Sequence, residues 1–253
     1  MDIVIIGTGN VATVLGRKFK SVGHRIVQVV GRDSKAASAL AYEWDTVSTN
    51  YNTPVSKAAE LYLVSVADDA IDEIAANIKL PGKIVAHTAA AVPKEVLHPM
   101  TEHFGVFYPL QTLRKEMDYV PDIPIFIDGS DAITREKLEK LAHSITTEKV
   151  ITASDDARLK LHVAAVVVSN FVNYLYKLAE DYCRKEGLDF DALLPLIEET
   201  ANRMEYISPS KTQTGPAFRH DSATIEKHLA LLKNYPQLRK IYQMMTESIE
   251  QMQ

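Results

Sequence analysis

Cysteine is almost absent from the chain, which limits how the fold can be held together. Cys183 is the one cysteine in 253 residues, so no disulfide can form within the chain. A chain without disulfides suits a reducing compartment, and we expect a cytoplasmic protein. Histidines at metal-ligand spacing are also missing, since His24, His98, His103, His143 and His228 show no such spacing with one another. We therefore predict no metal site.

Positive charge and long apolar runs are scarce as well. Lysine and arginine number 28 against 33 acidic residues, which leaves a net charge of −5. A general nucleic-acid binder usually needs a basic face, so we expect no nucleic-acid partner. The longest apolar stretch, 163–172, is interrupted by Ser169 and Asn170 and is too short to span a bilayer. The chain also starts directly in strand-like sequence, without the pattern of a signal peptide. We expect no membrane partner.

The first 150 residues alternate between strand-like and helix-like segments. Short apolar runs rich in β-branched residues are typical of strands buried on both faces of a parallel sheet, and they occupy 3–6, 25–30, 61–66 and 83–87. Helix-like stretches lie between them at 10–22, 34–42 and 69–78. Further strand candidates follow at 105–108, 123–127 and 149–152, with a helix at 131–146. This alternation predicts a doubly wound α/β Rossmann sheet over residues 1–153.

Strand signals end near residue 153, and the rest of the chain is helix-like. The segment 155–186 has the pattern of one long helix, with Gly187 as its stop. More helices are predicted at 189–206, 221–232 and 236–252. Residues 154–253 therefore form a predicted all-α domain. A helical tail of this size often buries itself against a second copy, and we expect a homodimer.

Small residues follow the first strand candidate at the spacing G-x-G-x-x-A, as Gly7, Gly9 and Ala12. The first glycine permits a tight turn, the second lets backbone approach a pyrophosphate, and the third small residue lets helix and strand pack closely. The motif gains weight because it lies between a strand and a helix in a βαβ unit. The turn residues are thus predicted to bind a dinucleotide cofactor: Gly7, Thr8, Gly9, Asn10 and Val11. The alternative is a glycine turn that binds nothing.

The end of the second strand candidate bears on the choice of dinucleotide. A fold that prefers NAD usually has an acid about 20 residues after the glycine motif, but this chain has Arg32 there. Arginine carries a planar fork suited to a 2′-phosphate, and Ser34 and Lys35 could add a hydroxyl and a charge. Asp33 leaves two interpretations open, because it could contact a ribose or cap the next helix. We expect NADP(H) rather than NAD(H), with Arg32, Asp33 and Ser34 at the cofactor.

Several stretches together resemble the Rossmann-like NADP oxidoreductases whose C-terminal helical domain has no assigned function. In the first half these are GTGNVA, VGRDS, LVSVADDAI, IVAHTAAA and YPLQT, and in the second half SNF and GPAFRHDSATIEKHLALL. Relatives of that family include pyrroline-5-carboxylate reductase, ketopantoate reductase and the 3-hydroxyisobutyrate dehydrogenases. The resemblance implies NADP(H) as cofactor and places Val66 and Ala67 beside it.

The chain also departs from the family pattern around the expected cleft. Ala89 and Ala90 stand where the family often has serine and glycine, and Tyr108 stands where it often has histidine. In the hydroxyacid-dehydrogenase relatives, a lysine four residues before an asparagine acts as acid and base. Aligning Asn170 with that asparagine puts Val166 in the position of the lysine. The resemblance therefore implies that the usual proton donor is absent.

Three residues are candidates for catalysis. A proton donor needs a pKa near the working pH, and histidine requires the least adjustment. His87 ends a strand at the carboxyl edge of the sheet, where ligands bind in this architecture. His162 lies eight residues before Asn170, which is about 2.2 α-helical turns, so the two share a face of the predicted helix. Each of the three has a structural alternative, namely a hydrogen bond to backbone or to a neighbouring helix.

Candidate substrate-binding residues come from a loop and from the helical half. Gln111 follows a strand candidate, and Asn173 lies in apolar surroundings where a buried amide needs partners. Arg219 follows a Gly-Pro turn and could hold a carboxylate, or it could form a structural ion pair.

The sequence thus predicts an NADP-dependent oxidoreductase that transfers hydride between NADP(H) and a small polar substrate such as a keto acid, hydroxy acid or imine. A non-catalytic NADP(H) sensor is the alternative, because the lysine is missing. A reductase with a deazaflavin partner is a third hypothesis.

Overall fold

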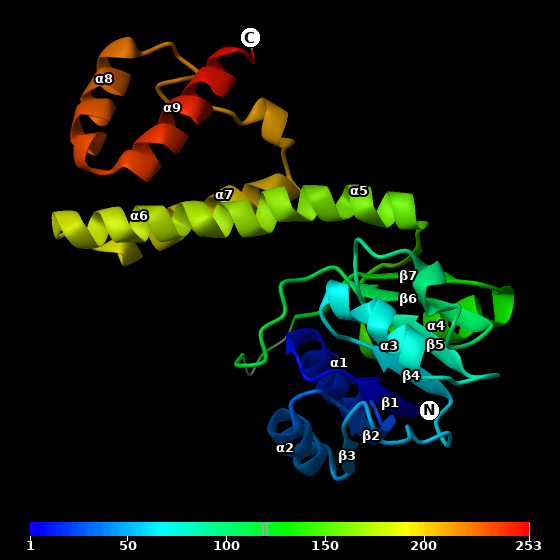
Figure 1. The fold of residues 1–253 in the computed structure, drawn as a ribbon. Coiled ribbons are helices and arrows are strands. Elements are labelled where there is room, and N and C mark those ends of the chain that lie inside the picture. Colours follow the sequence, from blue (N-terminus) through cyan, green and yellow to red (C-terminus); the bar gives the residue numbers. More distant parts are fainter. Residues whose placement is uncertain (118, 120, 253) are drawn as a thin grey trace. The chain divides into compact units, whose positions relative to one another are not determined.

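The computed structural model describes residues 1–117, 119 and 121–252, and its first part is built on one sheet (Figure 1). Eight strands follow the order β3-β2-β1-β4-β5-β6-β7-β8. All neighbours pair in parallel except β6 and β7, which are antiparallel. The strands are β1 (Asp2–Ile6), β2 (Arg25–Val30), β3 (Val47–Thr49), β4 (Leu61–Val64), β5 (Ile84–His87), β6 (His103–Pro109), β7 (Ile125–Gly129) and β8 (Val150–Thr152).

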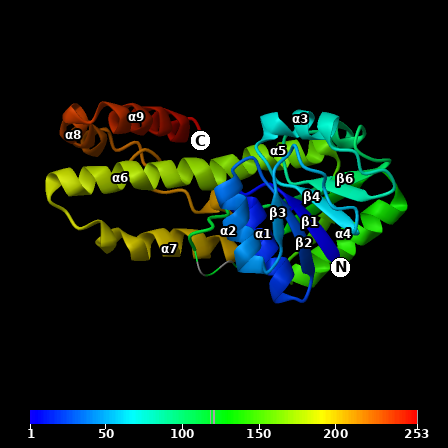
Figure 2. The same cartoon turned by 60° about the horizontal axis from the view of Figure 1, so that its bottom comes forward.

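Helices cover both faces of this sheet. Successive strand residues point to opposite faces, and on β1 Ile3 and Ile5 pack with α1, α2 and α4, whereas Val4 and Ile6 pack with α3. Figure 2 shows α1 and α2 on one side of the strands and α3 on the other. The helices of this part are α1 (Asn10–Ser21), α2 (Ser34–Trp44), α3 (Ile71–Asn77), α4 (Ala132–Ile145) and α5 (Asp155–Ala165), with short 3-10 turns η1 (Asp68–Ala70) and η2 (Lys94–Leu97). The predicted doubly wound Rossmann sheet is confirmed.

Two local features differ from the predictions. Strand β3 was not expected, because three residues at a sheet edge carry too little pattern to be seen in sequence. The long helix expected over 155–186 contains a π-helical segment, Val166–Phe171, between α5 and α6 (Val172–Glu186). The i→i+5 bonding of a π-helix changes the helical period. The shared helix face inferred for His162 and Asn170 assumed 3.6 residues per turn throughout, and it stays a prediction.

The chain divides into two compact units, Met1–Val167 and Val168–Gln253. The predicted boundary at residue 153 marks where the strands end, whereas the edge of the first unit lies after α5. The side chain of Arg158 on α5 explains the difference, because its Nε donates to the Ala90 carbonyl and its Nη2 to the Val92 carbonyl. These bonds tie α5 to the loop after β5.

The second unit is helical throughout its described residues. It contains α6, α7 (Leu194–Asn202), α8 (Ser222–Leu231) and α9 (Pro236–Glu250), joined by 3-10 turns. Gly187 ends α6 in the left-handed conformation with φ of 69°, as the sequence predicted. The predicted all-α C-terminal part is therefore confirmed. No helix among the described residues is long and apolar enough to cross a membrane.

Close packing of α1 on α2 leads to the first prediction. A Cβ added to Gly16 would lie 2.3 Å from Cη2 of the buried Trp44 ring, so an alanine cannot fit without displacing the indole. We expect Gly16→Ala to lower the free energy of unfolding by about 1–3 kcal/mol, measured by urea denaturation followed by circular dichroism. Ser21→Ala, at the exposed end of the same helix, should change it by less than about 0.5 kcal/mol.

A second substitution tests the cause. Trp44→Phe shortens the ring that the new methyl group would meet, so it should restore part of the stability lost by Gly16→Ala. If Trp44→Phe adds to the loss instead, the clash is not its source.

Candidate functional site

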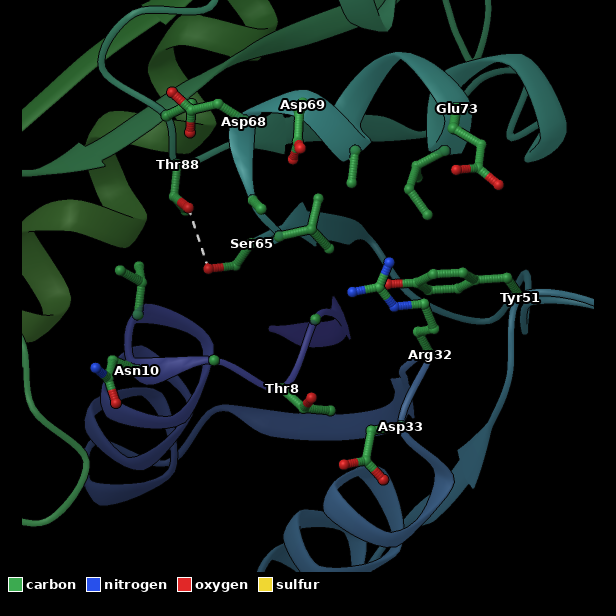
Figure 3. Close-up of a pocket in the computed structure, with 18 residues that line it drawn as sticks. Thr8, Asn10, Arg32, Asp33, Tyr51, Ser65, Asp68, Asp69, Glu73 and Thr88 are labelled. Atoms are coloured by element: carbon green, nitrogen blue, oxygen red, sulfur yellow. Dashed lines mark hydrogen bonds between the residues drawn. The ribbon is translucent and has the colours of Figure 1, made fainter.

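A pocket lies at the carboxyl edge of the sheet in the first unit (Figure 3). Its volume is about 580 Å³, which is within the usual range for a small-molecule or cofactor site. The residues that line it come from the segments that follow β1 to β5, including the start of α1, the turn η1 and α3, and they are Gly7, Thr8, Gly9, Asn10, Val11, Arg32, Asp33, Tyr51, Ser65, Val66, Ala67, Asp68, Asp69, Ala70, Glu73, Ile74, Thr88 and Ala89.

The turn between β1 and α1 forms one wall. Gly7 has φ of +128°, and its N–H donates to the Val30 carbonyl at 2.8 Å. A Cβ on Gly7 would lie 2.0 Å from the Ser65 carbonyl oxygen, so only glycine lets this turn approach β4. A Cβ on Gly9 would meet nothing within 4 Å, although Gly9 lines the pocket. At Gly9 the backbone therefore faces the cavity without a side chain in between.

The N-terminus of α1 opens into the same wall. Gly9 is the N-cap of α1, and no side chain accepts a hydrogen bond from the first N–H groups of the helix. Unsatisfied N–H groups and the helix dipole together make such an end an anion site. Asn10 and Val11, the first two residues of α1, line the pocket. The arrangement suits a pyrophosphate.

Arg32 and Asp33 extend this wall beyond β2. The exposed Arg32 guanidinium lies beside the Tyr51 ring (Figure 3). Burial raises the pKa of Tyr51, and the charge of Arg32 opposes that rise. Asp33 accepts hydrogen bonds from the N–H groups of Lys35 at 2.9 Å and Ala36 at 3.2 Å, so it caps α2 while also lining the pocket. Ser34 begins α2 and is not among the lining residues.

The opposite wall follows β4 and β5. Thr88 Oγ1 donates to Ser65 Oγ at 3.1 Å in a buried hydrogen bond. Val66 and Ala67 line the pocket beside Ser65, as the resemblance implied. Three carboxylates, those of Asp68, Asp69 and Glu73, also belong to this wall. An anionic group is repelled there, so the electrostatics favour phosphates on the side of the glycine turn.

Sequence reasoning missed several of these lining residues. Ser65, Asp68 and Asp69 lie in the stretch LVSVADDAI, but only Val66 and Ala67 of that stretch were assigned to the cofactor. Thr88 adjoins His87, which drew attention as the titratable group. Nothing in the sequence singles out Tyr51 or Glu73, because each reaches the pocket through tertiary packing.

His87 is fully buried at the end of β5 and does not line the pocket. Its Nδ1 accepts a hydrogen bond from the Ala89 N–H at 3.2 Å, which leaves the ring proton on Nε2. Nε2 has no partner of normal hydrogen-bond geometry among the described residues. Burial, aided by the charge of Arg158, lowers the pKa of His87 to about 4, and the Pro93 carbonyl only partly opposes this. His87 is therefore a neutral imidazole at pH 7.

Arg158 is the buried cation of this region, with 1% of its surface exposed. Besides the two carbonyls of the loop after β5, its Nη2 binds Asp155 Oδ1 at 2.7 Å. Lys94 on η2 forms a second ion pair, with Asp128 Oδ2 at 2.7 Å. These pairs fix the loop that follows His87, since they join it to α5 and to β7.

His162 forms a hydrogen bond that the sequence did not predict. Its Nδ1 lies 3.1 Å from Tyr108 Oη, and the two rings meet edge to face with centroids 6.2 Å apart. Tyr108 is on β6 and His162 on α5. Burial raises the pKa of Tyr108, while the charge of Arg158 acts in the opposite direction. A phenol and an imidazole in contact can pass a proton between them.

The remaining candidates lie elsewhere. Gln111 is exposed after β6, where its Oε1 accepts from the Thr112 N–H, and it does not line the pocket. Asn170 and Asn173 are exposed, so the interpretation of Asn173 as a buried amide was wrong. The apolar residues around them in sequence point to solvent rather than into a core. Arg219 is exposed in the second unit.

Among the described residues, no group of three or more His, Cys, Asp or Glu side chains is arranged to hold a metal ion.

Comparison with known proteins defines the class to which the chain belongs. Residues 1–111 match the family model "Rossmann-like domain", and residues 123–249 match "Domain of unknown function (DUF2520)". The chain belongs to the family that joins these two domains, and the predicted family resemblance is confirmed. No curated protein matches the chain.

Solved structures resemble it over nearly the whole length. The "putative NADP oxidoreductase" of Bacteroides fragilis is 37% identical with a TM-score of 0.90, covering 99% of this chain and 98% of that one. Pyrroline-5-carboxylate reductase of Streptococcus pyogenes is 13% identical with a TM-score of 0.63, covering 99% and 98%. The imine reductase of Myxococcus stipitatus in complex with NADP⁺ is 15% identical with a TM-score of 0.69, covering 99% and 93%. The last two likenesses concern the fold alone.

The buried histidine leads to a prediction about pH. Below its ordinary pKa of 6.5 the unfolded chain protonates His87, whereas the folded protein resists until about pH 4. The free energy of unfolding therefore falls as the pH drops through this window, by at most about 3 kcal/mol from this group. His87→Asn keeps an acceptor for Ala89 but does not titrate, so the difference from wild type should shrink between pH 7 and pH 4.5 in urea denaturation.

Met100→Leu serves as the non-titrating control in the same buried cluster. Its effect on the free energy of unfolding should be equal at both pH values. A His87→Asn difference that stays constant with pH would contradict the assigned pKa.

Proposed function

We propose that the protein is an NADP(H)-dependent oxidoreductase acting on a small polar substrate with a carbonyl or imine group. The proposal rests on one wall of the pocket. That wall combines the glycine turn, the uncapped N-terminus of α1 and Arg32. A pyrophosphate and a 2′-phosphate need these groups in this order along the sheet edge. The imine reductase with NADP⁺ shares the fold, and this supports the substrate class.

The chain's own residues fit the coenzyme. The turn at Gly7 and Gly9 leaves space for the coenzyme, and a Cβ on Gly9 would occupy that space. The backbone amides of α1 would bind the pyrophosphate. Arg32, at the end of β2, would bind the 2′-phosphate, which assigns the adenosine to that end of the pocket. Ser65 and Thr88, at the ends of β4 and β5, would then lie toward the nicotinamide. When bound, NADPH supplies the hydride.

A non-catalytic NADP(H) sensor is the second candidate. It is favoured by the burial of His87, which keeps this imidazole out of the pocket, and by Val166 in the position of the family's lysine. Binding without turnover would distinguish it from a reductase.

The second unit supports a homodimer. It exposes large apolar side chains, including Val168 at 72%, Leu196 at 62% and Phe171 at 58% of their surface. Exposed apolar surface of this extent marks an association face. The single, buried, unpaired Cys183 supports a reducing compartment such as the cytoplasm.

Turnover tests the proposal directly. NADPH oxidation should be followed at its absorbance band with a panel of keto acids, hydroxy acids and imines, after binding of NADPH has been measured by protection against heat. Binding with turnover of at least one compound supports the reductase. Binding without turnover supports the sensor, and no binding overturns both.

The two glycines of the turn should behave differently when changed to alanine. Gly9→Ala places a methyl group in the pocket without a clash, so the Kd for NADPH should rise by at least about tenfold while stability falls by less than about 1 kcal/mol. Gly7→Ala meets the Ser65 carbonyl at a positive φ and should cost more than about 2 kcal/mol of stability. Calorimetric titration and thermal unfolding measure both. Tight NADPH binding by Gly9→Ala would contradict the placement of the pyrophosphate.

Arg32 should set the coenzyme preference. Removing a charge-assisted contact to a 2′-phosphate costs about 1.5–3 kcal/mol, so Arg32→Ala should raise the Kd for NADPH by about 10- to 100-fold and leave the Kd for NADH unchanged. Lys35→Ala, a nearby exposed cation that does not line the pocket, is the matched control and should change the Kd for NADPH by less than about threefold. If both variants raised the Kd for NADPH equally, the preference for NADPH would come from the overall positive charge and not from Arg32.

A further inference from the structure

Tyr108 and His162 are brought together at the sheet edge that holds the pocket. Tyr108 Oη lies 3.1 Å from His162 Nδ1. β6, which carries Tyr108, pairs in parallel with β5, and β5 leads directly into Thr88 and Ala89 of the pocket wall. Adjacent strands are about 4.8 Å apart. The pair thus lies one strand beyond the wall that the proposed function assigns to the nicotinamide.

The side chain of Tyr108 lies on the pocket's side of the sheet. Alternation along β6 puts Tyr108 on the same face as Phe104, and Phe104 packs in the cluster formed with α3. The turn η1, which leads into α3, supplies Asp68 to the pocket wall. Asp68 acts electrostatically on Tyr108 and raises its pKa. Tyr108 is therefore near enough to the pocket to respond to a charge on its wall.

We propose that Tyr108 donates the proton that accompanies hydride transfer and that His162 is the positioning residue that restores it. This inference rests on the proposed function, because the proton has a use only when a substrate is reduced. It also accounts for the missing lysine, since a phenol hydrogen-bonded to an imidazole can supply the proton from β6 instead of from the long helix.

The proton balance is simple. A substrate C=O or C=N group gains a hydride at carbon, and its π electron pair moves onto oxygen or nitrogen. That atom takes the proton from Tyr108 Oη, so one O–H bond breaks and one O–H or N–H bond forms. The phenolate then takes the proton from His162 Nδ1 while solvent delivers a proton to Nε2, so the imidazole stays neutral and only changes its tautomer. Substrate is reduced by two electrons, and the coenzyme is oxidised by two.

Neighbouring groups hold the phenol in place for this step. The Tyr108 ring packs against Phe126 on β7, with centroids 6.5 Å apart. Arg158, anchored by two loop carbonyls and Asp155, opposes the rise of the Tyr108 pKa and so stabilises a transient phenolate. His87 does not compete for the role, because it is buried and its Nδ1 is occupied by the Ala89 N–H.

The first test needs no substrate. Oxidised coenzyme carries a positive nicotinamide and reduced coenzyme a neutral one, so the electric field at a nearby imidazole should differ between the two complexes. We expect the ring-proton resonances of His162 to have different chemical shifts with NADP⁺ and with NADPH, measured by NMR of the full chain at one pH. His162→Gln assigns the resonances. His143 on α4, on the other face of the sheet, is the control, and its resonances should coincide in the two complexes.

The second test uses turnover. 1-Pyrroline-5-carboxylate and 2-methyl-1-pyrroline serve as imine probes. Tyr108→Phe keeps the ring and removes the proton, so kcat should fall by about 100-fold or more, with KM and the Kd for NADPH within about twofold of wild type. His162→Gln should lower kcat less than Tyr108→Phe does.

The outcomes separate this inference from the proposed function. Failure to bind either coenzyme overturns the function and the inference together. Binding of both coenzymes with identical His162 resonances overturns the inference alone, as does a Tyr108→Phe variant with wild-type kcat. Wild-type protein that binds both coenzymes but turns over neither probe nor any other compound of the panel overturns the inference in favour of the sensor.

Discussion

The backbone of Gly7 approaches the end of β4 so closely that no side chain fits between them. A Cβ would lie 2.0 Å from the Ser65 carbonyl oxygen, and φ of +128° is itself a glycine conformation. This contact brings the turn after β1 against the strand beside it. The pocket depends on it, because its two walls begin at these two residues. The N-terminus of α1 then opens into the cavity instead of being capped by a side chain.

The charges around the pocket are divided between its walls, and this division gives the site a direction. Bare amides and Arg32 lie on the side of β1 and β2, together with Asp33, whose carboxylate caps α2, whereas Asp68, Asp69 and Glu73 lie on the side of β4 and α3. A ligand with several phosphates can lie along only the first wall. Its uncharged end is then directed toward the ends of β4 and β5, where the uncharged polar groups of Ser65 and Thr88 meet.

Much of the first unit could be predicted from the sequence, since its signals are local. Apolar runs that continue through four to six residues identified β1, β2, β4 and β5, and small residues at fixed spacing identified the turn after β1. Nine of the ten residues assigned to the cofactor line the pocket, and only Ser34 does not. The candidate proton donors were harder to predict. His87 was chosen because it ends a strand, but the loop after β5 folds over it and buries it. The π-helical segment, which alters the period of the long helix, gave no sequence signal.

By itself, the sequence determined the succession of strands and helices along the chain apart from β3, the phosphate-binding turn and the change to an all-helical second half. Each of these follows from residues near one another in the chain. Only the tertiary structure decided which residues complete the site. Tyr51 and Glu73 reach the pocket from separate elements, and Tyr108 meets His162 across 54 residues of sequence. These contacts depend on the order of the strands in the sheet and on the face from which each side chain projects. Neither property can be inferred from a single segment of the sequence.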